Sequence, residues 1–270
     1  MGYTLKSTLV IKGTGIHSGH SCTVILRPQD KGGIYFKKKD NDKKVKLALA
    51  NIKPQNLGTN LIKGDFQIKT IEHLIACLWF NRITDLLIEL DSDEIPIMDG
   101  SALVFMQQIE AIGRKSTATK PRILRINTPI IFTKDESYII ALPSRKLSIN
   151  YTINFPNVPL KTQNYIYCEG QPVNEIIPAR TFGNIEDVEK LHASGRALGA
   201  TMDNALVYNS KEYLNNPRFE LEAVKHKILD LIGDMYASGF NVKGRIIAYK
   251  TGHVINNAFM KKIVRELPLI

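Results

Sequence analysis

EAVKHKILDLIGDMYASG, residues 222–239, has the spacing of an amphipathic helix and ends in a glycine suited to stop it. His226 and Asp230 lie four residues apart in its middle. A helix places side chains at this spacing on one face, one turn apart. The pair is therefore either an ordinary contact between neighbouring side chains or two ligands aimed at one metal ion. Taken alone, the first interpretation is the more common.

The same order of predicted strands, helices and turns occurs around a histidine-bearing helix in each half of the chain. In the first half, SCTVILRP and KVKLALANI predict strands, Gly32 and Gly33 predict a hairpin-type turn, and KTIEHLIACLWFNR predicts a helix. Each half has strands, a helix that carries a histidine (His73 or His226), a strand, a turn containing glycine, and a last helix. This echo favours the α+β class, with two domains packed together and the helices of each on one face of its sheet.

A polar segment that ends in proline, RKSTATKPR at residues 114–122, is the best candidate for a linker. We therefore predict a first α+β domain over residues 1–119, with the Glu-His motif and a lysine-rich insertion. The second α+β domain is predicted over residues 120–270, with the helix quoted above and an insertion of its own.

The composition is that of a globular protein, because 44% of the 270 residues are hydrophobic and 23% are charged. No apolar run has the length of a membrane span, and the N-terminus lacks the apolar core of a signal peptide. The three cysteines are far apart and odd in number, which disfavours a disulfide framework. We expect a cytoplasmic protein without stable membrane insertion.

Much of the formal net charge of +10 lies in a lysine-rich stretch, DKGGIYFKKKDNDKKVKLALANIKP. It is compatible with nucleic-acid binding, with a peripheral contact to an anionic membrane, with attraction of a phosphorylated substrate, or with a solvated face whose edge strands carry lysine. The last interpretation ranks first. No nucleic-acid motif accompanies the charge, so we predict no nucleic-acid partner.

A catalytic zinc site usually needs three protein ligands and an open position for water. His226 and Asp230 supply two, and the third has to come from elsewhere. Adjacent helical residues diverge, so His73 could bind the metal while Glu72 reaches the water as a general base. Asp234 continues the Asp230 face by one turn and suits a carboxylate that orients a histidine, or else a surface acid.

Seven motifs resemble those of one family in their order: GIHSG, TIEHL, EIPIMDGSA, ARTFG, LGATMDNALV, KHKILDLIGD and KTGHVINN. They are similar to the successive motifs of the UDP-3-O-acyl-N-acetylglucosamine deacetylases, zinc amidases of lipid A biosynthesis in Gram-negative bacteria. The resemblance extends from near residue 13 to near residue 257. It implies two β-α-α-β domains with the active site between them, each with a small insertion. It also implies hydrolysis of the substrate's N-acetyl group with release of acetate, the committed step of that pathway.

The resemblance also assigns the metal site. It implies one zinc ion per chain, held by His73, His226 and Asp230. Glu72 would be the general base that deprotonates the zinc-bound water.

Further roles in the reaction follow from the same resemblance. His253 would act as a cation that stabilises the developing oxyanion and protonates the amine leaving group, and Asp234 would hold it. Thr181 would help to polarise the acetamide carbonyl. Because Glu72, His253 and the three ligands are all present, a relative that binds the nucleotide sugar without cleaving it is disfavoured.

The predicted partner is a small molecule, a UDP-linked acylated amino sugar, and we expect the chain to act as a monomer. The second insertion, near residues 184–207, would form an apolar passage for the acyl chain. Asn184 stands where the family commonly has an aromatic residue, which bears on chain-length preference. His17 either lines the substrate site or caps a turn. The predicted substrate contacts are Lys227, Phe182, His17, Ile185, Leu191 and Leu198.

Overall fold

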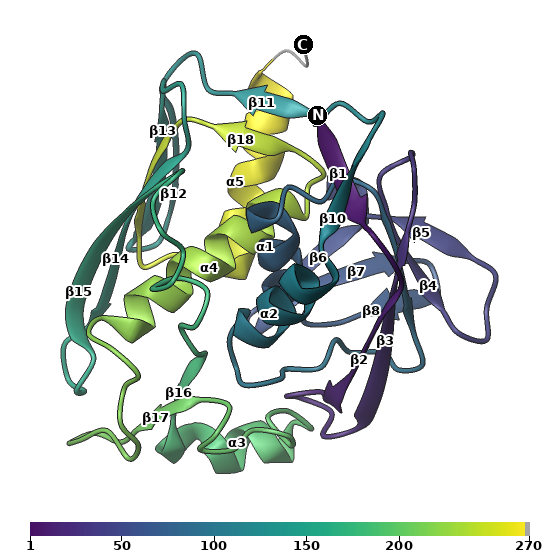
Figure 1. Ribbon diagram of the computed structural model, residues 1–270. Helices are drawn as coiled ribbons and strands as arrows, with labels where there is room; N and C mark the ends of the chain where they lie inside the picture. Colours follow the sequence, from purple (N-terminus) through teal and green to yellow (C-terminus); the bar gives the residue numbers. More distant parts are fainter. Residues whose placement is uncertain (268–270) are drawn as a thin grey trace.

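Two five-stranded sheets, one from each half of the chain, lie on either side of the main helices in the computed structural model, which describes residues 1–267 (Figure 1). The first sheet has the order β2 (Leu9–Thr14), β3 (Ser21–Pro28), β9 (Leu86–Leu90), β4 (Ile34–Lys38) and β5 (Lys44–Lys46). The second has the order β12 (Ile130–Lys134), β13 (Ser137–Leu142), β19 (Arg245–Tyr249), β14 (Ser148–Phe155) and β15 (Lys161–Cys168).

Both sheets have the same topology. In each, a late strand lies between two antiparallel hairpins and runs parallel to the first strand of the second hairpin, β9 beside β4 and β19 beside β14. The helices are α1 (Glu72–Phe80) and α2 (Leu103–Ile112) around β9, then α4 (Glu222–Tyr236) and α5 (His253–Glu266) around β19. The predicted α+β class is confirmed. The similar order of elements in the two halves corresponds to a repeated sheet topology.

A small extra piece precedes the histidine-bearing helix in each half. Before α1 it is an antiparallel sheet of β6 (Ile52–Gln55), β7 (Gly58–Lys63) and β8 (Phe66–Ile68). Before α4 it consists of β16 (Phe182–Asn184), η2 (Ile185–Asp187), α3 (Val188–Ala193) and β17 (Leu206–Tyr208). The lysine-rich stretch instead forms β4, β5 and the short η1 (Leu49–Asn51), so it is largely part of the repeated sheet.

In each half, a short strand near the start of the half pairs with a short strand near its end. These pairs are β1 (Gly2–Leu5) with β10 (Arg114–Thr117), and β11 (Ile123–Arg125) with β18 (Asn241–Lys243). The first four residues of the predicted linker are therefore a strand. The domain boundary between residues 119 and 120 stays a prediction.

The predicted hairpin at Gly32 and Gly33 is wrong. Both glycines have positive φ, 110° and 105°, so a turn is present. However, β9 lies between β3 and β4, and the two strands do not pair with each other. Because β9 comes about sixty residues after β3 in the sequence, local pattern alone pointed to the wrong partner for β3.

Helices α1 and α4 cross in direct contact between the two sheets, and the crossing depends on Gly233. A Cβ atom at this position would lie 2.2 Å from the main-chain oxygen of Glu72. Since real contacts do not approach this distance, only glycine lets the two backbones meet here. Almost every side chain of α1 is buried, and so is the inner length of α4, so the crossing forms the centre of the hydrophobic core.

We predict that Gly233→Ala lowers thermal stability. The new methyl group would force α1 and α4 apart, and overpacking of this kind costs about 1–3 kcal/mol. For a chain of this size the Tm should fall by roughly 2–10 °C, measured by calorimetry. Gly183→Ala is the matched control, because a Cβ at Gly183 has no atom within 4 Å. An unchanged Tm in Gly233→Ala would contradict this account of the crossing.

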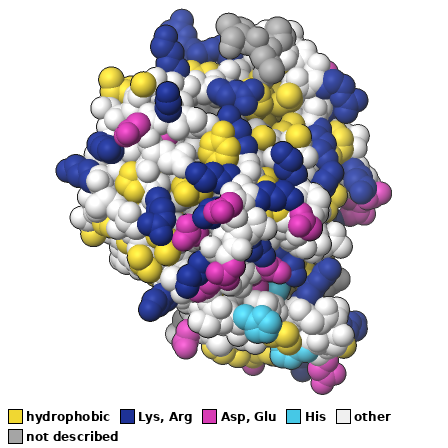
Figure 2. Space-filling view, turned by 90° about the vertical axis from the view of Figure 1, so that its right-hand side faces the viewer, with side chains coloured by type: hydrophobic (Ala, Val, Ile, Leu, Met, Phe, Trp, Pro, Cys, Tyr) yellow, Lys and Arg dark blue, Asp and Glu magenta, His cyan; other side chains and the backbone are white. Residues whose placement is uncertain are grey.

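The basic side chains do not gather into one patch on the face that Figure 2 shows. Figure 2 shows Lys and Arg side chains scattered across one whole face, with acidic side chains among them. Several are paired, for example Lys37 with Asp42 at 3.1 Å and Lys43 with Asp65 at 2.5 Å. This distribution favours a solvated face over a nucleic-acid groove. Across residues 1–267, every helix is too short or too polar to cross a bilayer.

Candidate metal and catalytic site

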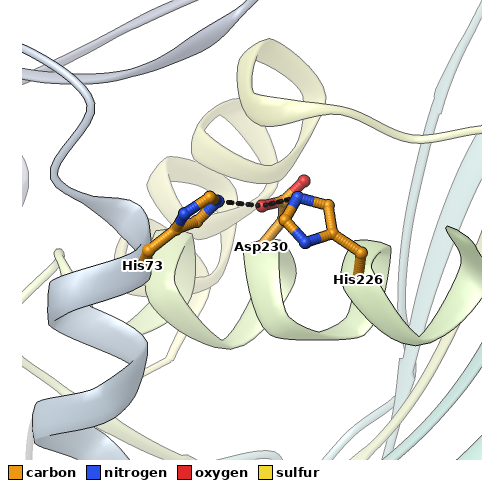
Figure 3. Close-up of side chains that lie close together, drawn as sticks. All are labelled: His73, His226 and Asp230. Carbon is orange, nitrogen blue, oxygen red and sulfur yellow. Dashed lines mark ion pairs between the residues drawn. The ribbon is translucent and has the colours of Figure 1, made fainter. Parts of the chain in front are cut away.

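His73, His226 and Asp230 meet at the crossing of α1 and α4 (Figure 3). His73 lies in the first turn of α1, and the other two lie one turn apart on α4. All three side chains are buried, and one potential ligand atom from each lies within 4.8 Å of the others. The structure therefore brings together residues that are more than 150 positions apart in the sequence.

The spacing of these atoms fits a tetrahedral metal ion. The Nε2 atoms of His73 and His226 lie 3.5 and 3.3 Å from Oδ1 of Asp230. Two ligands bound to zinc at about 2.0–2.1 Å with a tetrahedral angle would be about 3.3 Å apart. Oδ1 of Asp230 is also buried with no hydrogen-bond partner among the described residues. Because a buried carboxylate oxygen is costly without a partner, this atom is well suited to bind a cation.

Two of the candidate ligands, His226 and Asp230, are held by the protein through their second polar atom. Nδ1 of His226 lies 2.9 Å from the carbonyl oxygen of Ala179. A carbonyl only accepts, so Nδ1 carries the proton and Nε2 presents its lone pair to the metal position. Lys227 donates to Oδ2 of Asp230 at 2.6 Å, which leaves Oδ1 facing the two imidazoles.

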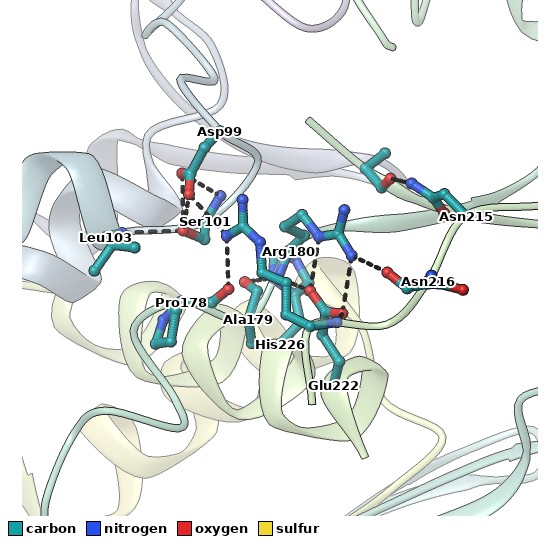
Figure 4. A network of polar contacts seen from close by, with 12 residues as sticks. Asp99, Ser101, Leu103, Pro178, Ala179, Arg180, Asn215, Asn216, Glu222 and His226 are labelled. Carbon is teal, nitrogen blue, oxygen red and sulfur yellow. Dashed lines mark hydrogen bonds and ion pairs between the residues drawn. The ribbon is translucent and has the colours of Figure 1, made fainter. Parts of the chain in front are cut away.

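A polar network, buried at Arg180 and Glu222, supports Ala179 and thus the orientation of His226 (Figure 4). Arg180 donates to Glu222 through its backbone N at 3.0 Å and through Nε at 2.9 Å. Arg218 donates to the Pro178 carbonyl at 2.9 Å and to Asp99 at 2.8 Å. Through Asp99 the network connects the EIPIMDGSA motif of the first half to the ARTFG motif of the second.

Glu72 and His253 face each other beside the metal position. Nε2 of His253 lies 4.0 Å from Oε1 of Glu72 and 3.8 Å from Oδ2 of Asp230. Nδ1 of His253 donates to Asp234, with the nearer oxygen 2.9 Å away. Helix α5 begins at His253, and Tyr151 holds the preceding loop through a 2.5 Å hydrogen bond to the Thr251 carbonyl.

The surroundings set the charges that these groups carry. Burial raises the pKa of Glu72, although His253 and His73 oppose the change. Burial lowers the pKa of His226 to about 4, against the pull of Asp230, so this imidazole is neutral as a metal ligand requires. Burial opposes ionisation of Asp230, but the positive groups around it hold its pKa well below the usual range. Burial also acts to lower the pKa of His253, yet the nearby carboxylates, Asp234 first, raise it to about 9.

These shifts leave the site with a distinct acid and base. At neutral pH His253 is a cation, and burial raises the pKa of the Glu72 carboxyl, which suits a group that accepts a proton. Strongly shifted pKa values on two facing titratable groups are typical of sites of acid–base catalysis. The arrangement can therefore take a proton on one side of the metal position and give one on the other.

One cavity of about 680 Å³ contains the site. Its wall includes the three candidate ligands, and it also includes nearly all of the other predicted residues: Glu72, His253, Thr181, Lys227, Phe182, His17, Ile185 and Leu191. Asp234 lies behind His253, outside the lining. Leu198 is also outside the lining and is 51% exposed, whereas its neighbour Ala197 is part of the wall.

The ring of His17 lies on the cavity wall and also contacts the main chain on both sides. Its ring is part of the cavity wall, and Nε2 lies 3.0 Å from the carbonyl oxygen of Leu57. Its Nδ1 accepts a bond of 3.4 Å from the backbone N of Ala197. The ring thus connects the first half to the second insertion while facing the cavity.

Three groups near the site were missed from sequence. Thr59 on β7 contacts both Glu72 and Asp234. Glu94 is buried and accepts from the backbone N atoms of His17 and Ser18 at 2.9 and 2.8 Å. The Arg180–Glu222 pair is the third. Glu94 and Arg180 could have been found from sequence, because they lie inside the quoted motifs EIPIMDGSA and ARTFG. Thr59 could not, because no local pattern distinguishes it.

The sequence matches the model of the LpxC family, UDP-3-O-acyl N-acetylglycosamine deacetylase, over residues 2–265. A UDP-3-O-acyl-N-acetylglucosamine deacetylase from Leptospira biflexa serovar Patoc (strain Patoc 1 / Ames) is 35% identical over 271 residues, covering 98% of this chain and 90% of the relative. Proteins of the same name from Syntrophotalea carbinolica and Synechocystis sp. are 38% and 35% identical. Each match covers 97% of this chain, and 87% and 98% of the relatives.

Proposed function

This chain belongs to the UDP-3-O-acyl N-acetylglycosamine deacetylase (LpxC) family, and from that membership we propose that it hydrolyses the N-acetyl group of UDP-3-O-acyl-N-acetylglucosamine with one zinc ion. His73, His226 and Asp230 would hold the ion. The observation that carries the proposal is the buried, unpartnered Oδ1 of Asp230 between two imidazoles, in the same cavity as Glu72 and His253.

When bound, zinc would polarise the acetamide carbonyl and lower the pKa of a water molecule from about 16 to about 7. Glu72 takes the proton of the attacking water as oxygen adds to the carbonyl carbon, a role that suits a carboxylate with a raised pKa. Thr181, which lies on the cavity wall, would donate to the carbonyl oxygen.

His253 completes the reaction on the other side of the site. As a cation it stabilises the negative charge that develops on the oxygen, and then it donates its Nε2 proton to the nitrogen. The C–N bond breaks as the amine becomes protonated, leaving acetate and a free amino sugar. Asp234 holds the imidazole with Nδ1 toward itself, so that Nε2 points into the site.

The apolar part of the cavity fits the acyl chain of the substrate. Ile185, Val188 and Leu191, from η2 and α3 of the second insertion, line it together with Phe182. Lys227 is a cation on the same wall, suited to a polar or anionic part of the substrate. We therefore assign the acyl passage to residues 182–207, with Ala197 rather than Leu198 at its wall.

The 3-O-acyl chain should contribute strongly to catalytic efficiency. Each buried methylene is worth about 0.8 kcal/mol, so a chain that buries several should raise kcat/KM by about 100-fold or more. The measurement is acetate release from UDP-3-O-acyl-N-acetylglucosamine compared with UDP-N-acetylglucosamine. Equal kcat/KM for the two compounds would contradict the assignment of the passage.

A pair of variants locates the passage. Leu191→Asn places a polar group on the cavity wall and should reduce the advantage of the acylated substrate. Leu198→Asn makes the same change at an exposed position outside the wall and should leave that advantage intact. Equal effects of the two substitutions would count against the boundary drawn here.

We also propose that the chain acts as a monomer in the cytoplasm. Its three cysteines are free, and two of them are buried, which suits a reducing compartment.

A further inference from the structure

Thr59, on β7, contacts both Glu72, the proposed base, and Asp234, the carboxylate that holds the proposed acid His253. Its side chain and backbone are almost completely buried, with the residue 1% exposed. The backbone N donates to Oε2 of Glu72 at 2.9 Å, and the hydroxyl donates to Oδ1 of Asp234 at 2.5 Å. Its carbonyl oxygen accepts from the N of Ile71, immediately before α1. One residue thus contacts the base, the carboxylate behind the acid, and the start of the helix that carries the base.

The hydroxyl bond completes the set of contacts on Asp234. Three groups donate to this buried carboxylate, namely Thr59, Nδ1 of His253 and Nδ2 of Asn256. The two from α5 are closest to Oδ2, at 2.9 and 2.8 Å, and Nδ1 of His253 also lies 3.1 Å from Oδ1, where Thr59 is the shorter contact at 2.5 Å. Without the hydroxyl, both remaining donors would come from α5, and Oδ1 would lose its shortest contact. Thr59 therefore helps to fix the plane of the carboxylate, which the imidazole of His253 follows.

The contact also joins the two halves of the molecule. Thr59 belongs to the insertion of the first half, and Asp234, His253 and Asn256 belong to the second. The distance of 4.0 Å between Glu72 and His253 is set by how these parts meet. Because displacements of about 1 Å in a catalytic arrangement can cost 100-fold in rate, a single bond at this place can matter.

We propose that Thr59 is a positioning residue, which orients His253 through Asp234 while its backbone N orients Glu72. The inference rests on the proposed deacetylation, and it adds a group that touches neither the substrate nor the metal ligands. It predicts that the hydroxyl affects turnover and leaves substrate and metal affinity unchanged.

Two pairs of side chains at position 59 isolate the effect of the hydroxyl group. Threonine and valine have the same shape and differ in the donor, and serine and alanine differ in the same way at smaller volume. Loss of a hydrogen bond to a charged group should lower kcat about tenfold or more in Thr59→Val. KM and zinc content should remain those of wild type. Thr59→Ser should retain most of the wild-type kcat and Thr59→Ala should not, so the second pair gives an answer if the valine variant does not fold.

The matched control is Thr117→Val. Thr117 donates to the buried Asp85 at 2.7 Å, which is the same kind of bond away from the catalytic residues, and its loss should leave kcat unchanged. Making Thr59→Val in the His253→Ala variant then shows whether Thr59 acts by positioning His253 or by a general effect on the structure. If Thr59 acts through His253, Thr59→Val will cost little more in that background.

Two outcomes overturn the proposal: a wild-type kcat in both Thr59→Val and Thr59→Ala, or equal losses with and without His253. Failure of the deacetylase assignment would look different, because wild-type protein would then release no acetate from the UDP-linked substrate.

Discussion

His226→Ala will lose both its zinc and its activity. The imidazole supplies one of three ligands, and no other histidine on α4 can take its place. Removing a partner that only orients a ligand costs about 10–100-fold in metal affinity, so removing a ligand should cost more. The variant also leaves Asp230 and His73 around an incomplete site. Elemental analysis of the purified protein and acetate release are the two measurements.

His20→Ala is the control for this substitution. His20 is an exposed histidine in the turn after β2 and is not part of the cavity wall. It should retain zinc and activity. A His226→Ala protein that kept a full complement of zinc would show that the ion binds elsewhere.

Glu72→Gln gives the opposite pattern, with zinc retained and turnover lost. The amide has almost the shape of the carboxylate, and its oxygen can still accept from the N of Thr59. It cannot take a proton from water at neutral pH. General-base catalysis contributes about 100- to 10,000-fold, and kcat should fall within that range.

Glu72→Asp tests whether the position of the base matters in addition to its chemistry. The shorter side chain keeps a carboxylate but withdraws it from the gap facing His253. We expect activity between those of wild type and Glu72→Gln, with zinc content unchanged. Near-full activity in Glu72→Gln would remove the role assigned to this carboxylate.

The helices of the fold could be predicted from sequence, because their signals are local. Residues 222–239 have helical periodicity and a terminal glycine, and α4 occupies Glu222–Tyr236. Likewise Gly113, with a φ of 75°, directly follows α2, and a glycine at this place is a local stop signal for a helix. The strand partners could not be predicted in this way. Pairing between β3 and β9 depends on where a strand sixty residues further along the chain comes to lie.

The same distinction holds for the site. The face shared by His226 and Asp230 follows from helical spacing, but spacing alone left it open whether the two bind a metal. Only the crossing of α1 and α4, allowed by Gly233, brings His73 to Asp230. Thr59 could not be predicted either, since its importance comes entirely from Glu72 and from Asp234, which is 175 residues away. Leu198 belongs to the segment that the resemblance assigns to the acyl passage, but its own side chain is 51% exposed, and which side chains of that segment face the cavity depends on the fold.

Zinc content measured together with acetate release tests the central claim most directly. The protein would be assayed as purified, after removal of metal by a chelator, and after stepwise return of zinc, with UDP-3-O-acyl-N-acetylglucosamine as substrate. The account predicts that activity rises in proportion to bound zinc and is complete at one ion per chain. Undiminished acetate release from metal-free protein would contradict it.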